Sequence, residues 1–173
     1  NINAGAIQIG NNGSAGSLNA GSTVNIGANG TMYVRRTDSV SATSILPSTI
    51  TFSAAASRFE YNPNSSSAAL NLNQDLGALV SGAATTGYFR VSGGTLTLAS
   101  GTDVVASTAS LGLQSGTNIG TLNIGAGSTL TTRFLNVGEE GSNSGIINQS
   151  GGALTVQTGS NGFRLGHWGN GAN

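Results

Sequence analysis

Few residues of this 173-residue chain could do chemistry, and those few form no recognisable catalytic constellation. His167, the only His, precedes Trp168, the only Trp. A lone imidazole can act as a base or bind a metal, but the chain has no Cys and no carboxylate lies near His167 in sequence. A structural or interface role is therefore favoured. Glu139 and Glu140 are adjacent, so on a strand or turn they point apart and do not form a glycosidase carboxylate pair.

The remaining charged residues are equally sparse. Asp38, Asp75 and Asp103 lie far apart in sequence, whereas polysaccharide lyases built on β-helices need clustered carboxylates beside a basic group. Such a cluster could assemble from different coils, but six carboxylates and no Lys disfavour it. Arg35 and Arg36 are expected to bind carbonyl groups or a neighbouring subunit rather than phosphate. We predict no catalytic residue, no metal site and no cofactor.

Hydroxyl and amide side chains supply two weaker signals. The Thr-Leu-Thr triplets at 95–97 and 129–131 are similar to the ladders of ice-binding solenoids, but two scattered copies do not make a flat face. Four Asn residues begin Asn-x-Ser/Thr sequons and are candidate glycosylation sites, although abundant Asn, Ser and Thr create sequons by chance: Asn12, Asn29, Asn64 and Asn148.

Composition bounds the class of protein. Only 7% of residues are charged and the net charge is zero, against roughly 25% charged residues in ordinary globular domains. Nucleic-acid binding and attraction to anionic lipid are therefore disfavoured, and self-association is favoured. The 37% of hydrophobic residues argues against disorder. We find no signal peptide, lipidation motif or membrane-inserting segment.

One short pattern recurs along the chain: an apolar strand, a Gly/Ser/Asn turn and a second short strand. Copies begin at Ile7, Leu111, Leu135 and Leu165, with spacings of 24 (135 minus 111) and 30 (165 minus 135). Imperfect repeats at such spacing indicate stacked units rather than a globular core.

Short strands with period-two alternation are dense, and Asn and Gly residues that tolerate positive φ separate most of them. The Ala- and Leu-rich segment 65–84 is the best helix candidate, but we interpret it as strand because residues 69–73 alternate and Gly77 and Gly82 interrupt it. Connections of four to seven residues are too short for helical crossovers, which leaves a β-solenoid or an antiparallel sandwich. Gly and Asn corners favour a solenoid of roughly seven coils, at about 20 to 27 residues per coil.

Residues 37–67 are less regular and contain both Pro residues, Pro47 and Pro63. Proline cannot donate a ladder hydrogen bond, so we expect loops or a lateral bulge here within a single unit spanning residues 1–173. Three aromatic residues of this excursion are candidate glycan contacts: Phe52, Phe59 and Tyr61.

The runs 92–101, 120–130, 149–159 and 161–168 resemble the Gly-rich β-strand repeats of bacterial autotransporter passenger domains. They are also similar to repeats in large secreted proteins with a Pro-Glu-Pro sorting signal. The resemblance covers residues 1–32 and 88–173. It implies an all-β, right-handed parallel β-helix displayed outside a bacterial cell, and it specifies architecture rather than activity.

The open ends of a solenoid can pair with the strands of another chain, and we find no polar cap at either end. We therefore expect a non-catalytic extracellular or cell-surface protein that stacks head to tail with itself into a fibre. The alternatives are an adhesin fragment that binds glycan or a host surface through the 37–67 excursion and, less favoured, a polysaccharide-degrading enzyme. The expected subunit interface consists of Ile2, Ala6, Ile7, Ile9, Phe163, Leu165, His167 and Trp168.

Overall fold

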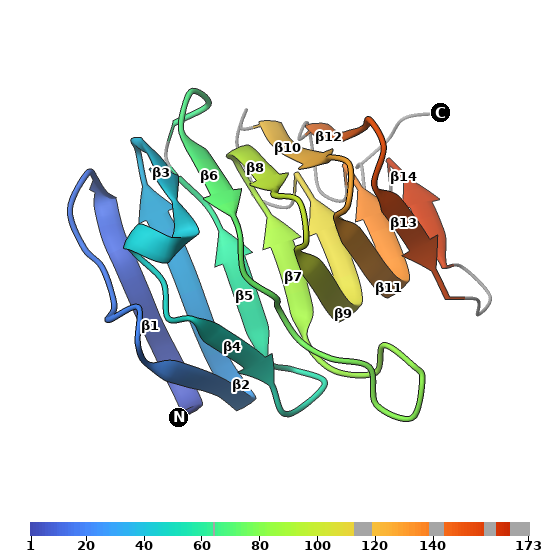
Figure 1. Ribbon diagram of the computed structural model, residues 1–173, viewed down its shortest axis with the longest axis horizontal. Helices are drawn as coiled ribbons and strands as arrows, with labels where there is room; N and C mark the ends of the chain where they lie inside the picture. The colour runs from blue at the N-terminus through green and yellow to red at the C-terminus, as the bar shows by residue number, and fades with distance from the viewer. Residues whose placement is uncertain (64, 113–118, 139–143, 158–161, 167–173) are drawn as a thin grey trace.

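The chain forms a β-solenoid of about six turns, seen in a computed structural model that describes residues 1–63, 65–112, 119–138, 144–157 and 162–166 (Figure 1). Within these ranges all pairing between the named strands is parallel, and the only helix is the 3-10 turn η1 (Ala42–Ser44). The all-β parallel solenoid predicted from the sequence is confirmed, with one coil fewer than the seven expected.

Stacked strands form three runs, which we call the first, second and third faces. The first face contains the first half of β2 (Thr23–Arg36), β4 (Thr49–Phe52), the first halves of β9 (Asp103–Leu111) and β11 (Thr129–Val137), and β13 (Ala153–Val156). The second face contains β1 (Ile2–Gly13), the second half of β2, β5 (Arg58–Tyr61), β7 (Tyr88–Val91), the second halves of β9 and β11, and β14 (Phe163–Leu165). The third face contains β3 (Ser39–Ser41), β6 (Ala69–Leu72), β8 (Gly94–Leu98), β10 (Ile119–Ile124) and β12 (Ser144–Gln149).

The core consists of apolar columns that run along the stack. On the third face, Leu70 pairs in register with Leu96 and Leu96 with Leu122, each 26 residues further along the chain (96 minus 70, 122 minus 96), and all three are fully buried. Because side chains alternate across a strand, every second residue of a strand points into the core. In-register stacking then aligns each of these residues with its partner in the next coil, so that a column forms. Each coil is therefore held by the coils before and after it.

Glycine allows the chain to turn tightly where coils touch. A Cβ at Gly120 would collide with the carbonyl oxygen of Val91 in the preceding coil. Gly77, at φ +75°, opens a longer departure from the coil, and a Cβ there would meet the carbonyl oxygen of Val105. These positions accept no other residue without moving backbone.

The excursion expected at residues 37–67 lies elsewhere. That segment forms β3, η1, β4 and β5, and both of its prolines are buried at corners of the coil. The departure occurs instead at residues 77–87, where Val80 and Ala83 exchange two backbone hydrogen bonds of 2.9 and 3.0 Å in an antiparallel bridge. This inserted segment lengthens its coil, so Phe59 and Phe89 pair across 30 residues (89 minus 59) whereas Phe89 and Ala109 pair across 20 (109 minus 89).

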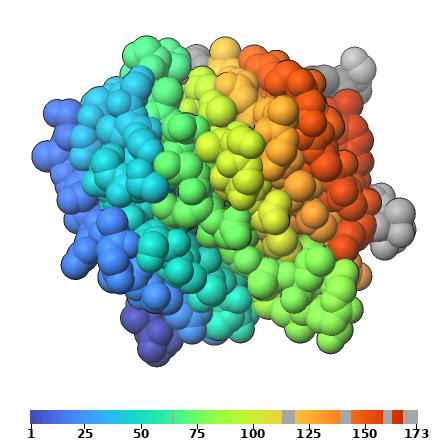
Figure 2. Space-filling view, in the orientation of Figure 1, coloured from blue at the N-terminus to red at the C-terminus, as the bar shows by residue number. Residues whose placement is uncertain are grey.

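The inserted segment runs along the stack toward its C-terminal end. Its backbone binds the side chain of Gln157, just after β13: Ala84 N donates to Oε1 at 2.7 Å, and Nε2 donates to the carbonyl of Gly82 at 3.1 Å. In Figure 2 it forms the light-green mass beside the later coils, which follow one another as coloured bands across the molecule. The segment thus ties a middle coil to the last one.

Replacing Leu96 by Ala should lower the free energy of unfolding by about 2–5 kcal/mol, because the cavity would interrupt a column between two coils that cannot collapse onto each other. Urea unfolding followed by circular dichroism measures this. Thr121→Ala is the matched control, since Thr121 points outward on the adjacent strand, and should change stability by about 0.5 kcal/mol or less. Equal effects of the two substitutions would contradict the columnar core.

Candidate functional site: the open last coil and the outer second face

The last coil leaves apolar side chains uncovered. Phe163 and Leu165 continue the inward columns of Leu135 and Val137, yet they are 55% and 69% exposed whereas Leu135 is 1% exposed. Within the described residues, β12, β13 and β14 each pair with a strand on one side only. The described part of this coil therefore combines exposed apolar side chains with strands that pair on one side only, and another strand can pair with such an edge.

The first coil is different. The sequence predicted that its inward residues Ile2 and Ile9 would be part of the subunit interface. They are only 6% and 2% exposed, so their side chains are not available to a partner. The reason is that residues 14–22 complete this coil: Leu18 packs against the core, and its N–H donates to the carbonyl of Ile45 at 2.8 Å. Ile7 is half-buried and Ala6 is exposed. His167 and Trp168 lie outside the described residues.

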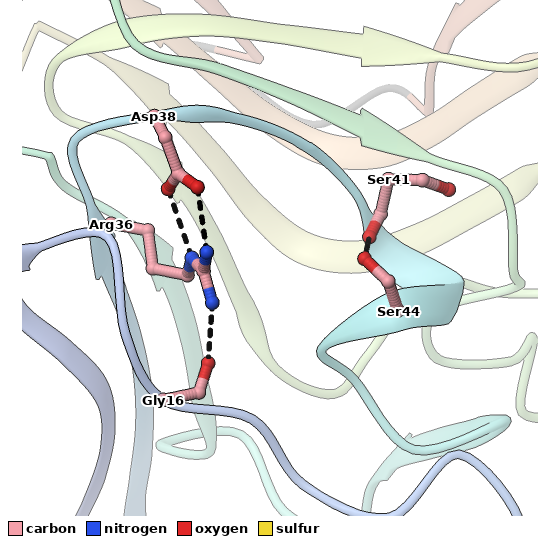
Figure 3. A network of polar contacts seen from close by, with 5 residues as sticks. All are labelled: Gly16, Arg36, Asp38, Ser41 and Ser44. Carbon is pink, nitrogen blue, oxygen red and sulfur yellow. Dashed lines mark hydrogen bonds and ion pairs between the residues drawn. The ribbon is translucent and has the colours of Figure 1, made fainter.

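A polar clamp holds residues 14–22 in place (Figure 3). Arg36 donates to both carboxylate oxygens of Asp38 at 2.9 and 2.6 Å and to the carbonyl of Gly16 at 2.9 Å. The hydrogen bonds from Arg36 lower the pKa of Asp38 and keep it charged. The expectation that this Arg doublet binds carbonyls is thus confirmed for Arg36, while Arg35 points to another surface.

That surface is the outside of the second face, where six residues of three adjacent strands form what we call the Arg–Tyr patch: Tyr33, Arg35, Arg58, Glu60, Tyr88 and Arg90. The guanidinium carbon of Arg35 lies 4.7 Å from the ring centroid of Tyr33, and that of Arg90 lies 5.4 Å from the ring centroid of Tyr88. Such distances fit cation–π contacts. Both Tyr residues and all three Arg residues are half-buried, so they pack as a layer over the sheet.

The only carboxylate of the patch is built into its floor. Glu60 is 4% exposed, and its Oε1 accepts hydrogen bonds from Asn62 Nδ2 at 3.1 Å and from Ser92 Oγ at 3.0 Å. This patch is not apparent from the sequence because its members come from separate coils. The patch could have been found from strand alternation, which places every second residue on the outside. This alternation is visible in Arg58-Phe59-Glu60-Tyr61 and again in Tyr88-Phe89-Arg90-Val91.

The three aromatic residues expected to contact glycan are instead part of the core. Phe52, Phe59 and Tyr61 are 7%, 0% and 0% exposed. Phe59 stacks against Phe89 in the next coil at 6.1 Å between ring centroids. The expectation of an aromatic glycan surface at these residues is therefore wrong, because the strand alternation turns their side chains inward.

Three of the four sequon asparagines can be placed. Asn12 and Asn29 are exposed, and Asn12 adopts a positive φ of 56° at the end of β1. Asn148 is also exposed, but its Nδ2 donates to Asn123 Oδ1 at 2.9 Å within a row of outward side chains on the third face. Asn64 lies outside the described residues.

Two carboxylates treated as isolated in the sequence are neighbours in space. Asp75 accepts a hydrogen bond from the backbone N–H of Asp103 at 2.8 Å, and Asp103 accepts one from the Thr129 hydroxyl at 2.5 Å. Neither bond involves a basic side chain, and no group of three His, Cys, Asp or Glu residues suited to a metal ion occurs in the described ranges. Glu139 and Glu140 lie outside those ranges. The pair therefore acts as a link between coils.

Comparison with protein-family models, with curated proteins and with solved structures gives no match. Among the described residues, no helix is long and apolar enough to span a bilayer.

Replacing Tyr61 by Phe should raise the free energy of unfolding by about 1 kcal/mol, because the buried hydroxyl has no hydrogen-bond partner among the described residues. Burial also raises the pKa of this hydroxyl, so it stays neutral. Thermal and urea unfolding measure the change, and Tyr88→Phe, on the outer surface, is the control with little expected effect. A marked loss of stability in Tyr61→Phe would show that the hydroxyl is satisfied.

Proposed function

We propose that this protein is a non-catalytic structural element of the cell surface or extracellular space, whose solenoids stack head to tail into a fibre. The observation that carries the proposal is the exposure of Phe163 and Leu165 in the last coil, beside β13 and β14, each of which pairs on one side only among the described residues. The extracellular location is supported by the resemblance to secreted Gly-rich repeats. A head-to-tail contact uses two different surfaces and does not close, so it extends indefinitely.

The opposite end of the stack offers a matching edge (Figure 1). In the described residues β1 pairs with β2 alone, and it contains no charged residue and no proline. Edge strands are usually protected by charges, prolines or bulges, so β1 is unusually open to pairing between Ala4 and Ile9, where its register is regular.

The columns of the second face define the register of such a contact. Ile7 pairs with Met32, the column continues through Phe59, Phe89, Ala109 and Leu135, and it ends at Phe163. A second copy that continues the stack would place its half-buried Ile7 against Phe163. Its Ile9, whose side chain is already buried, would lie beside Leu165 through backbone pairing alone. The outward neighbours Gln8 and Arg164 would then face each other.

Energetics favour a contact that depends on concentration. Burying Phe163 and Leu165 contributes roughly 1.5–3 kcal/mol each, whereas association costs about 4–15 kcal/mol in lost translational and rotational freedom. The additional free energy needed for association must come from burial of the half-buried Leu154 and Val156 and from new backbone hydrogen bonds along β1. Fibres are therefore expected at high protein concentration rather than in dilute solution.

The double variant Gln8→Cys/Arg164→Cys tests this register. Parallel strands lie about 4.8 Å apart, within the Cα separation that a disulfide spans, and the chain has no other Cys. Mild oxidation at high concentration should produce a ladder of covalent oligomers on non-reducing gels, with filaments visible by electron microscopy.

Two controls separate register from random oxidation. Gln8→Cys alone should give dimers at most. Thr51→Cys/Arg164→Cys, which pairs the last coil with an outward position of a middle coil, should give no ladder above that background. Equal ladders from both double variants, or no ladder from Gln8→Cys/Arg164→Cys, would overturn the proposed stacking.

A further inference from the structure

We propose that the Arg–Tyr patch on the outer second face binds an acidic polysaccharide of the uronic-acid type. The patch spans β2, β5 and β7 and includes neither the edge strand β1 nor any strand of the last coil. The inference therefore does not depend on fibre formation, and a monomer would bind as well as a fibre subunit.

Two of the three Arg residues of the patch have no carboxylate partner among the described residues. Arg35 and Arg58 form no ion pair with any described residue, and the Nε of each is buried without a hydrogen-bond partner. The nearest carboxylate in the layer, Glu60, is occupied on Oε1 by Asn62 and Ser92. The chain as a whole carries no net charge, so the patch is a local positive excess on a neutral molecule.

The other carboxylates that the structure describes lie elsewhere on the solenoid. Asp38 is paired with Arg36 at the corner after β2, and Asp75 and Asp103 lie on the first face. The guanidinium groups of Arg35 and Arg58 are thus available to an anion from outside the coil. Guanidinium groups bind carboxylates through two parallel hydrogen bonds, which adds geometric specificity to the attraction.

The shape and chemistry of the patch indicate a carbohydrate polymer. Its floor is a sheet of parallel strands spaced about 4.8 Å apart, which suits an extended chain. Tyr33 and Tyr88 supply half-buried rings with one apolar face and one hydroxyl each, and such side chains contact ligands that are partly apolar and partly hydroxylated. Nucleic acid is disfavoured, because nucleic-acid-binding surfaces draw on many cations and this chain has six in total.

Binding of sodium polygalacturonate, with neutral dextran as the comparison, tests the proposal by isothermal titration calorimetry on the unmodified protein. We expect binding to polygalacturonate alone, weakening between about 50 and 200 mM salt, as ionic contacts do. The double variant Arg35→Gln/Arg58→Gln should lose affinity by about tenfold or more.

Arg133→Gln is the matched charge control. Arg133 is exposed on β11, outside the patch, with its guanidinium 5.3 Å from the ring of Phe134. The affinity of the Arg133→Gln variant for polygalacturonate should be within about twofold of that of the unmodified protein. Circular dichroism and thermal unfolding check that all variants are folded. Equal binding of dextran, unchanged affinity in Arg35→Gln/Arg58→Gln, an equal loss in Arg133→Gln, or equally tight binding of single-stranded DNA would each overturn the proposal.

Discussion

A coil of this solenoid buries its apolar side chains mainly against the coils on both sides of it, and the rest of the structure depends on this constraint. A single rung buries little: its apolar residues are covered by the residues of the same column above and below. Leu96, between Leu70 and Leu122, is fully buried, whereas Leu165, with a neighbour on one side among the described residues, is 69% exposed. Stability in such a stack is close to a sum over adjacent pairs of coils, so the ends are its weakest parts.

The two ends respond differently to that constraint. At the first coil, residues 14–22 and the Arg36–Asp38 clamp help to bury Ile2 and Ile9, leaving mainly the backbone edge of β1. At the last coil, Gln157 binds the inserted segment 77–87, which anchors the coil to the middle of the stack without covering Phe163. The backbone edge of β1 can pair with that of β14, and the half-buried Ile7 can cover Phe163, which supports our proposal of head-to-tail growth.

Alternation and Gly/Asn corners predicted the parallel solenoid, because both are local properties of the sequence. Coil length was less predictable: roughly seven coils were expected and about six are present, and the insertion at 77–87 lengthens one coil whereas the next one is short. The two prolines were expected to mark an excursion from the coil. Pro47 and Pro63 instead lie at buried corners. The inward direction of Phe59 and Tyr61 was readable from strand parity, but the contact between Asp75 and Asp103 was not, because it depends on which coil lies next to which.

Amide hydrogen exchange, measured residue by residue in dilute and in concentrated solution, tests most directly whether a coil needs neighbours on both sides. The account predicts slow exchange in β5 to β8 at all concentrations. It also predicts fast exchange in β1, β13 and β14 when dilute, becoming slow when concentrated. Protection of these end strands that is already complete in dilute solution, or middle strands that exchange as fast as the ends, would contradict it.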